Sequence, residues 1–291
     1  MDIIGNSHEI YGAIREIRRG NRSIGFVPTM GDLHAGHISL VERAREIAGF
    51  TVVSIFVNPF QFGEGEDYQS YPRTLDADIA KLKAVGTDLL FTPKVTDLYP
   101  DGLEHITRVE VPAMGKILCG ISRPVFFRGI TTVVSMLFHL VQPDYAIFGE
   151  KDYQQLVIIE RMVSDLKMPV EIIPAPTARE ADGLAMSSRN GYLTAGERQR
   201  APALYKALCE ARDSITAGNV DIEAIQSKGF ETLMARGLRP DYFEVRRATD
   251  LAVPEREELQ QDKQNLRIIA AALLGKARLI DNIAVAPRLH V

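Results

Sequence analysis

The segment with the clearest chemical potential runs from Pro28 to His37 and reads Pro-Thr-Met-Gly-Asp-Leu-His-Ala-Gly-His. It follows a strand-like run and precedes a helical pattern. Free backbone N–H groups and the positive end of a helix dipole beside such a loop favour phosphate. Gly31 and Gly36 let the backbone approach a ligand closely. His34, three residues before His37, would share one side of the first helical turn with it, so both rings can donate hydrogen bonds to a phosphate chain.

Two plainer interpretations of this histidine pair stay open. One is a helix cap combined with a partly buried histidine. The other is a zinc pair, although no neighbouring Cys/His cluster supplies further ligands. The sequence has no G-x-x-x-x-G-K-[ST] loop and no G-x-G-x-x-G that opens a helix, which excludes these two nucleotide-binding motifs. The strand–glycine–helix context favours phosphate binding.

Two other loops carry polar side chains suited to small substrates. Asn58 and Gln61 follow an apolar strand, and ligands of open α/β sheets bind at the carboxyl ends of strands. Their neutral amides suit hydroxyl groups and a carboxylate that must still react. The loop Met186–Asn190 offers two hydroxyls and a guanidinium for a phosphate clamp. Taken alone, the first is more typical of an ordinary polar turn and the second of a solvated loop.

A third polar segment, Phe148–Gln155, again joins a strand-like run to a helical one. Lys151 could neutralise phosphate charge, and Asp152 could hold ribose hydroxyls. Gln155 would face the same cleft about one turn further on. The alternative is a charged helix start with Asp152 as its N-cap.

Strand-like and helix-like segments alternate up to about residue 175. This alternation predicts an α/β fold with a doubly wound parallel sheet. The strand patterns fall at 24–27, 51–57, 88–91, 145–148 and 170–173, and the helical patterns at 37–48, 75–85, 130–140 and 153–166.

The pattern changes after Pro174, where two prolines within 174–177 indicate a linker. Helical patterns at 195–216 and 221–236 precede strand patterns at 242–247, 266–274 and 277–285. This order predicts a second, smaller α+β domain. We therefore divide the chain into residues 1–176 and 177–291.

Composition excludes several classes of protein. The 291 residues include 34 basic and 38 acidic ones, a net charge of -4, which argues against a nucleic-acid binder. Cys119 and Cys209 suggest neither a disulfide framework nor a metal site. No apolar run approaches the roughly 18 residues of a membrane span. The start at Met1-Asp2 shows no signal-peptide pattern, so we expect a cytoplasmic protein without membrane or nucleic-acid partners.

Five segments in order carry a resemblance to a known family. Pro28–His37 contains the H-x-G-H pattern of the nucleotidyltransferase superfamily. Together with four more segments it resembles the pantoate–β-alanine ligase (pantothenate synthetase) family. These are Phe56–Phe62, Arg123–Gly129, Phe148–Leu156 and Glu180–Asn190.

The resemblance implies a Rossmann-like N-terminal domain and a C-terminal lid domain. It implies ATP-dependent joining of pantoate and β-alanine through pantoyl adenylate, with AMP and pyrophosphate as products. Mg²⁺ would accompany ATP, and the N-terminal domains would form a homodimer. His37 would be the proton donor, with His34 and Lys151 as further catalytic residues. Gln61 would touch pantoate and β-alanine, and Gln155 would hold pantoate. The implied ATP-binding residues are Met30, Gly31, Asp32, Leu33, His34, Ala35, Gly36, His37, Gly149, Glu150, Lys151, Asp152, Ala178, Met186, Ser187, Ser188 and Arg189.

The chain departs from this family in places. It has Phe126 where the family commonly has the histidine of R-P-G-H-F, so an apolar ring replaces a polar one near the expected cleft. Met136 and His139 stand where Lys and Asn are frequent. Three rival functions stay open: transfer of a nucleotidyl group to a phosphorylated acceptor, a non-catalytic nucleotide-binding module, and a plain scaffold protein that does not bind ATP. The paired glutamines favour an uncharged, hydroxyl-bearing acid over a phosphorylated acceptor.

Overall fold

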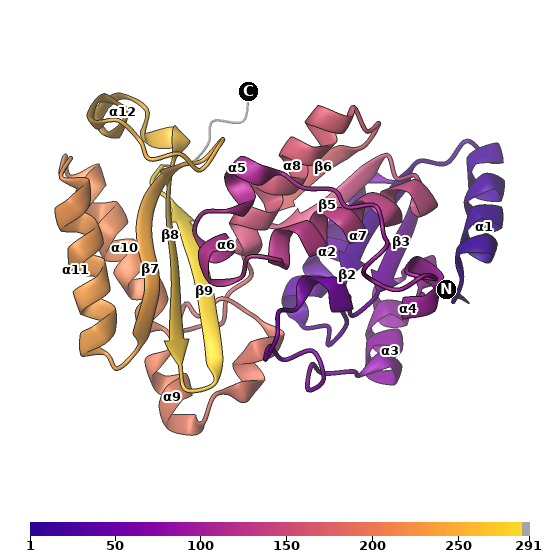
Figure 1. Ribbon diagram of the computed structural model, residues 1–291, viewed down its shortest axis with the longest axis horizontal. Coiled ribbons are helices and arrows are strands. Elements are labelled where there is room, and N and C mark those ends of the chain that lie inside the picture. Colours follow the sequence, from indigo (N-terminus) through magenta and orange to yellow (C-terminus); the bar gives the residue numbers. More distant parts are fainter. Residues whose placement is uncertain (287–291) are drawn as a thin grey trace. The chain divides into compact units, whose positions relative to one another are not determined.

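The computed structural model describes residues 1–286 and divides into two compact units. The first unit comprises Met1–Glu150 and Ile158–Pro176, and the second comprises Lys151–Val157 and the chain from Thr177 onward (Figure 1). The sequence division left 151–157 in the first domain, whereas the structure groups this stretch with the second unit. Residues 287–291 of the expected second domain lie outside the described residues.

Six strands form one parallel sheet in the first unit, in the order β1-β4-β3-β2-β5-β6. This confirms the predicted doubly wound parallel sheet. The strands are β1 (Asp2–Ile4), β2 (Ile24–Thr29), β3 (Phe50–Ile55), β4 (Leu89–Phe91), β5 (Tyr145–Gly149) and β6 (Glu171–Ala175). The helices are α1 (Ser7–Arg19), α2 (Ala35–Ile47), α3 (Leu75–Val85), α4 (Val95–Leu98), α5 (Pro112–Gly115), α6 (Cys119–Ser122), α7 (Phe126–Val141) and α8 (Tyr153–Leu166), whose first residues belong to the second unit.

Neighbouring residues of β2 show why both faces of this sheet are covered. Successive side chains of a strand point to opposite faces. Val27 packs in a core with Val41 and Ala44 of α2, while the ring of Phe26 meets that of Phe138 in α7 at 6.3 Å. Two layers of helices therefore enclose the central strands, which explains their unbroken apolar character.

The topological switch point lies between β2 and β5. From β2 the chain winds through α2 to β3 on one side, and from β5 it winds through α8 to β6 on the other. Ligands of open α/β sheets bind at such a point, beyond the carboxyl ends of the strands. The H-x-G-H loop leaves β2 there, and Gly149 closes β5 there.

The expected linker at 174–177 begins later than predicted. Pro174 and Ala175 are the last residues of β6, paired with Phe148 and Gly149 of β5. A proline lacks a backbone donor but fits a strand at the edge of a sheet, and β6 is the edge strand. The linker prediction was therefore wrong for these two residues.

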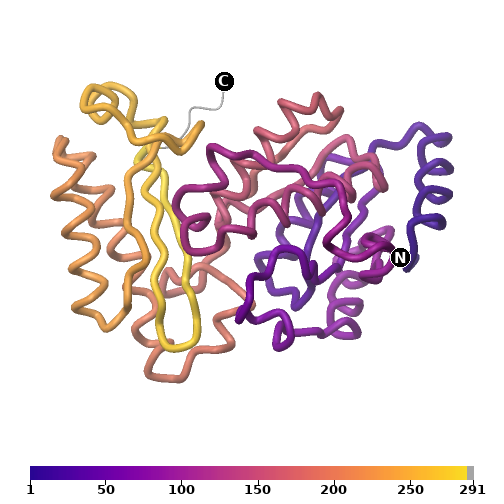
Figure 2. Tube along the Cα trace, in the orientation of Figure 1, coloured from indigo at the N-terminus to yellow at the C-terminus, as the bar shows by residue number. Residues whose placement is uncertain are grey.

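The second unit contains a three-stranded antiparallel sheet in the order β7-β8-β9. In the Cα trace the β8–β9 hairpin is the yellow pair of strands (Figure 2). Helices α10 and α11 pack on the sheet, as an α+β domain requires. The strands are β7 (Arg239–Arg247), β8 (Leu266–Leu274) and β9 (Ala277–Ala284), and the helices are α9 (Ala195–Arg200), α10 (Ala203–Thr216), α11 (Ile222–Ala235) and α12 (Arg256–Gln261). The single helix predicted at 195–216 is interrupted at Pro202.

Within the first twenty residues, for which the sequence patterns gave no prediction, the structure contains β1 and α1. A helix signal was present, since the Asn6 side chain caps α1 and Ile10 and Ile14 are buried one turn apart. None of the helices within residues 1–286 combines the length and the apolar character that a membrane crossing needs.

Candidate active site

The two histidines of the H-x-G-H loop form a reciprocal cap at the start of α2. Nδ1 of His34 accepts the backbone N–H of Gly36 at 3.1 Å, and Nδ1 of His37 accepts that of His34 at 3.3 Å. The ring centroids lie 4.1 Å apart. Because each Nδ1 is an acceptor, the ring proton sits on Nε2. The cap interpretation and the paired-donor interpretation are therefore compatible, since they use opposite ring nitrogens.

The zinc alternative gains no support from the structure. Within residues 1–286, no group of three or more His, Cys, Asp or Glu side chains lies together as a metal site. A zinc site needs at least three protein ligands. The histidine pair is better described as two capped imidazoles.

The backbone of the same loop is held by a distant carboxylate. Gly31 and Asp32 both have positive φ, 85° and 51°. The N–H groups of Asp32 and Leu33 each lie 2.8 Å from an oxygen of Asp78. Free backbone N–H groups were expected beside this loop from the sequence, and Asp78 already occupies these two.

Gln61 lies in the short 3-10 helix Pro59–Gln61 beyond β3 and is buried. Its Nε2 is 3.0 Å from Sδ of Met30, the first implied nucleotide-binding residue of the H-x-G-H loop. Its Oε1 accepts from Nδ2 of Asn58 at 3.2 Å. The structure thus brings the expected pantoate side chain next to the expected ATP loop within the first unit.

Tyr99 completes this arrangement, and its role was not predicted from the sequence. Its buried hydroxyl donates to Oδ1 of Asn58 at 2.7 Å. Burial raises the pKa of Tyr99 well above its usual value, so the hydroxyl keeps its proton. That donor makes Oδ1 of Asn58 the acceptor and turns Nδ2 toward Gln61. Nothing in the spacing of Tyr99 from Asn58 predicts this contact, because the two residues meet only through the fold.

Helix α7 approaches the Gln61 segment at a glycine. A Cβ atom on Gly129 would lie 2.5 Å from the carbonyl oxygen of Phe60 and 2.6 Å from Cα of Gln61. Only glycine allows this contact. The carbonyl of Gly129 also accepts from Nδ2 of Asn58 at 3.1 Å. The start of α7 therefore fixes the backbone that carries Gln61.

Phe126, the departure from the family pattern, supports an arginine. The guanidinium of Arg123 lies 3.5 Å from the centroid of the Phe126 ring. The same guanidinium binds both carboxylate oxygens of Glu66, with Nε donating at 2.8 Å. An aromatic face attracts a cation, so the apolar ring has a defined contact in place of the histidine.

In the second unit, a hairpin brings two of the implied nucleotide-binding segments together. The N–H of Met186 donates to the carbonyl of Ala178 at 3.0 Å, and Arg179 bridges to Ala185 in antiparallel fashion. The Ser187 side chain then caps the 3-10 helix Ser188–Tyr192 through the N–H of Arg189. The structure therefore joins Ala178 to Met186–Arg189, which are separated in the sequence.

Strand β9 anchors this hairpin through a buried ion pair. Arg179 donates to both oxygens of Asp281, at 2.6 and 2.9 Å. Burial raises the pKa of Asp281, and the Arg179 guanidinium acts in the opposite direction. The next residue, Asn282, donates to the carbonyl of Lys151 at 3.0 Å. One strand thus holds both the hairpin and the backbone of the expected catalytic lysine.

The remaining expected residues lie around the start of α8. Nζ of Lys151 is 3.4 Å from the carboxylate of Asp152. Gln155 is partly buried in the first turn of α8. Gly149 and Glu150 belong to the first unit, and Lys151, Asp152 and Gln155 to the second.

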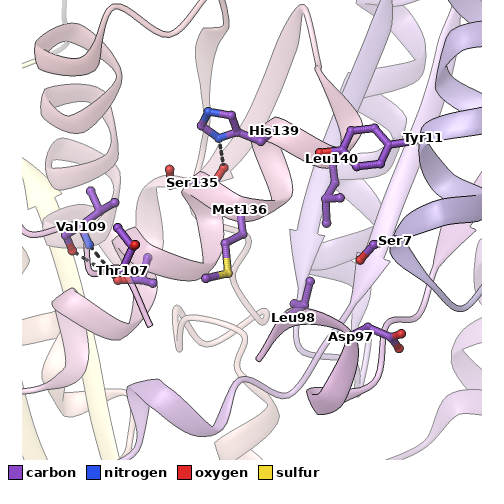
Figure 3. A pocket seen from close by; sticks show the side chains of 11 residues that line it. Ser7, Tyr11, Asp97, Leu98, Thr107, Val109, Ser135, Met136, His139 and Leu140 are labelled. Carbon is purple, nitrogen blue, oxygen red and sulfur yellow. Dashed lines mark hydrogen bonds between the residues drawn. The ribbon is translucent and has the colours of Figure 1, made fainter. Parts of the chain in front are cut away.

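A separate pocket of about 320 Å³ lies in the first unit between α1, α4 and α7 (Figure 3). None of the expected site residues lines it. Met136 and His139, two departures from the family pattern, do, and Nδ1 of His139 lies 2.7 Å from the carbonyl oxygen of Ser135.

The first unit therefore has the features of a Rossmann-like nucleotidyltransferase: a doubly wound sheet, and an H-x-G-H loop at its switch point. The sequence profile described as pantoate-beta-alanine ligase matches residues 2–284. The chain belongs to the pantoate–β-alanine ligase family.

Individual relatives agree with this assignment. The chain is 53% identical to a pantothenate synthetase of Hahella chejuensis, over 98% of this chain and 99% of that protein. It matches a crystal structure of pantothenate synthetase from Thermus thermophilus with a TM-score of 0.90 and 45% identity, over 99% of this chain and 100% of that one. It also matches a pantoate–β-alanine ligase from Francisella tularensis, complexed with β-γ ATP and β-alanine. That match has a TM-score of 0.79 and 35% identity over 98% of each chain.

Proposed function

We propose that this protein joins pantoate to β-alanine at the expense of ATP, and that it does so through pantoyl adenylate. Family membership over residues 2–284 supports the reaction. The observation that best supports placing the reaction in this part of the first unit is the 3.0 Å contact between Gln61 and Met30. It sets a neutral amide, suited to a hydroxy acid, beside the loop that suits a nucleotide.

The reaction needs activation because a free carboxylate is a poor acyl donor. In the first step, a carboxylate oxygen of pantoate attacks the α-phosphorus of ATP and pyrophosphate leaves. In the second step, the amine of β-alanine attacks the acyl carbon, AMP leaves with the oxygen that bridged carbon and phosphorus, and the amine loses a proton. Both steps depend on positioning and charge stabilisation, and neither requires a side-chain nucleophile.

We assign the phosphate-facing roles in the first unit to the two imidazoles. Nε2–H of His34 and of His37 would donate to phosphate oxygens, with His37 as the proton donor as negative charge builds on the leaving pyrophosphate. Met30 to His37 would follow the nucleotide, with Gly149 and Glu150 at the end of β5. Gln61 would hold pantoate and later β-alanine.

We assign the remaining contacts to the second unit. Lys151 would neutralise phosphate charge, Asp152 would hold ribose hydroxyls, and Gln155 would hold pantoate. The hairpin would carry Ala178 beside the adenine and Met186, Ser187, Ser188 and Arg189 on the nucleotide. We also propose that this unit acts as a lid, because an acyl adenylate hydrolyses in water.

Magnesium would be held mainly by the nucleotide. Mg²⁺ typically keeps several waters and binds substrate phosphates with one or two carboxylates, which suits a site where the described residues form no acidic cluster. When bound, it would neutralise phosphate charge. We further propose a homodimer through the N-terminal domain and a cytoplasmic location, where ATP is abundant. We propose no nucleic-acid or membrane partner.

The test is a product balance with purified protein, ATP, Mg²⁺, pantoate and β-alanine. We expect one AMP and one pyrophosphate for each pantothenate formed. Formation of ADP and phosphate, or transfer of a nucleotidyl group without AMP release, would contradict the proposal.

A further inference from the structure

Asp78 is a fully buried carboxylate in the first turn of α3. Oδ2 accepts the N–H of Asp32 at 2.8 Å and the hydroxyl of Thr74 at 3.1 Å, while Oδ1 accepts the N–H of Leu33 at 2.8 Å. Nζ of Lys81 lies 3.9 Å from Oδ1 and donates to the carbonyl of Leu33 at 2.6 Å. Both oxygens of Asp78 thus accept hydrogen bonds, and two of the three groups that donate these bonds belong to the H-x-G-H loop.

The loop depends on this support for its shape. Left-handed backbone is unfavourable for a residue with a Cβ, and Asp32 adopts it at φ 51°. Gly31 precedes it at φ 85°, where an added Cβ would lie 3.2 Å from Oδ2 of Asp78 and 3.1 Å from Cγ2 of Ile55. Successive N–H groups in such a turn form a concavity that binds an anion, and here the anion is the chain's own carboxylate.

This clamp ends one residue before His34, the N-cap of α2. The direction in which the chain leaves Leu33 therefore sets where α2 begins and which way the capped imidazoles turn. We propose that Asp78 is a positioning residue for adenylation: it fixes the H-x-G-H loop so that His34 and His37 meet the phosphates. This inference rests on the proposed function.

The chemistry of the clamp requires a carboxylate. An ionised Asp only accepts hydrogen bonds, whereas an Asn of the same shape presents a donor NH₂ on one side. In Asp78→Asn, that NH₂ would face the N–H of Asp32 or Leu33, or the hydroxyl of Thr74. Asp76→Asn is the matched control, because Asp76 lies in the same turn, makes the same charge change and is exposed.

The two half-reactions are measured separately. The first is pyrophosphate release from ATP and pantoate, and the second is pantothenate formation from preformed pantoyl adenylate and β-alanine. For Asp78→Asn we expect the first rate to fall about 100-fold, the loss that a displaced catalytic group produces, with the second rate within about threefold of wild type. Asp76→Asn should match wild type in both.

A second pair of variants covers the case in which Asp78→Asn does not fold. Lys81→Met keeps the carboxylate and removes the bond to the Leu33 carbonyl, and Lys83→Met is its exposed control on the same helix. We expect a selective loss of about fivefold in the first step for Lys81→Met, the value of one hydrogen bond. An equal loss in both half-reactions, or no loss in a folded Asp78→Asn, overturns the positioning role. If wild-type protein releases no pyrophosphate with pantoate, the proposed function itself fails and this inference falls with it.

Discussion

In the first unit, neutral hydrogen bonds run from Tyr99 to Asn58 and from Asn58 to the amide of Gln61, whereas in the second a buried ion pair holds the hairpin that begins at Ala178. The Gln61 network contains no charged side chain. The hairpin is fixed by a guanidinium with 19% of its side chain exposed and a carboxylate with 3%.

The difference fits what each region would bind under the proposed function. Pantoate brings a carboxylate that has to attack phosphorus, and a fixed cation beside it would weaken the nucleophile through a charge-assisted bond. A neutral, pre-oriented amide such as that of Gln61 would bind the acid without this effect. The hairpin has no such restriction, so a buried ion pair can anchor it, although losing one partner of such a pair is costly.

The largest effect is expected from the chemistry of the first unit itself. His37→Ala removes a donor to the phosphates, and we expect the rate of adenylation to fall about a thousandfold, within the range for a lost acid or base. The exposed His8 provides the control His8→Ala, which should leave the rate unchanged. Pyrophosphate release measures both. A folded His37→Ala protein that releases pyrophosphate at the normal rate would remove His37 from the mechanism.

The anchor of the second unit is expected to give the next largest effect. Arg179→Met leaves Asp281 buried without its cation, and we expect a loss of about 3 kcal/mol in the free energy of unfolding near pH 8. Burial raises the folded-state pKa of Asp281, so the folded variant takes up a proton more readily than the unfolded chain. The loss in the free energy of unfolding should therefore shrink as the pH is lowered through that raised pKa toward 3.8, the ordinary pKa of an Asp carboxyl.

Urea unfolding across this pH range is the measurement. Arg198→Met is the control within the same unit, because Arg198 pairs with Glu180 and Asp182 at the surface. It should cost at most about 1 kcal/mol. Equal losses for Arg179→Met and Arg198→Met would remove the distinction between a buried and a surface pair.

A smaller effect should come from loosening the neutral network. Tyr99→Phe deletes only the hydroxyl that donates to Asn58, and the N–H of Phe60 still donates to the same oxygen. We expect the KM for pantoate to rise about fivefold, the value of one hydrogen bond, with the KM for ATP unchanged. Steady-state kinetics with each substrate varied in turn would detect this. A rise in the KM for ATP alone would mean that Tyr99 does not orient Gln61.

The smallest effect concerns the departure from the family pattern. Phe126→His replaces the ring beneath Arg123. We expect turnover to change less than about threefold, because an imidazole ring can also lie against the partly buried guanidinium and the Arg123–Glu66 pair remains. A gain of tenfold or more in turnover would show that Phe126 limits the site.

Local patterns were sufficient for most of the fold. The predicted helices 75–85 and 153–166 coincide with α3 and α8, since each combines apolar spacing with clear ends. The predicted strand 51–57 is β3, which begins one residue and ends two residues earlier than predicted. β1 is only three residues long and carries no such pattern, so pairing with β4 rather than local preference defines it.

Local sequence patterns could not predict the residues that hold the site in place. Asp78 contacts a loop 45 and 46 residues away, and Asp281 pairs with Arg179 across 102 residues. An aspartate fits an exposed helix start and a strand end equally well, so the residue type alone does not reveal these contacts. Only the fold brings them to the segments that the motifs had identified.

The central claim is that a carboxylate oxygen of pantoate becomes bonded to the α-phosphorus. Pantoate labelled with ¹⁸O in its carboxylate, incubated with the wild-type protein, ATP, Mg²⁺ and β-alanine, tests this directly. We predict that mass spectrometry will find one labelled oxygen in the AMP and the other in the amide carbonyl of pantothenate. Label in inorganic phosphate, with none in AMP, would contradict the adenylate route.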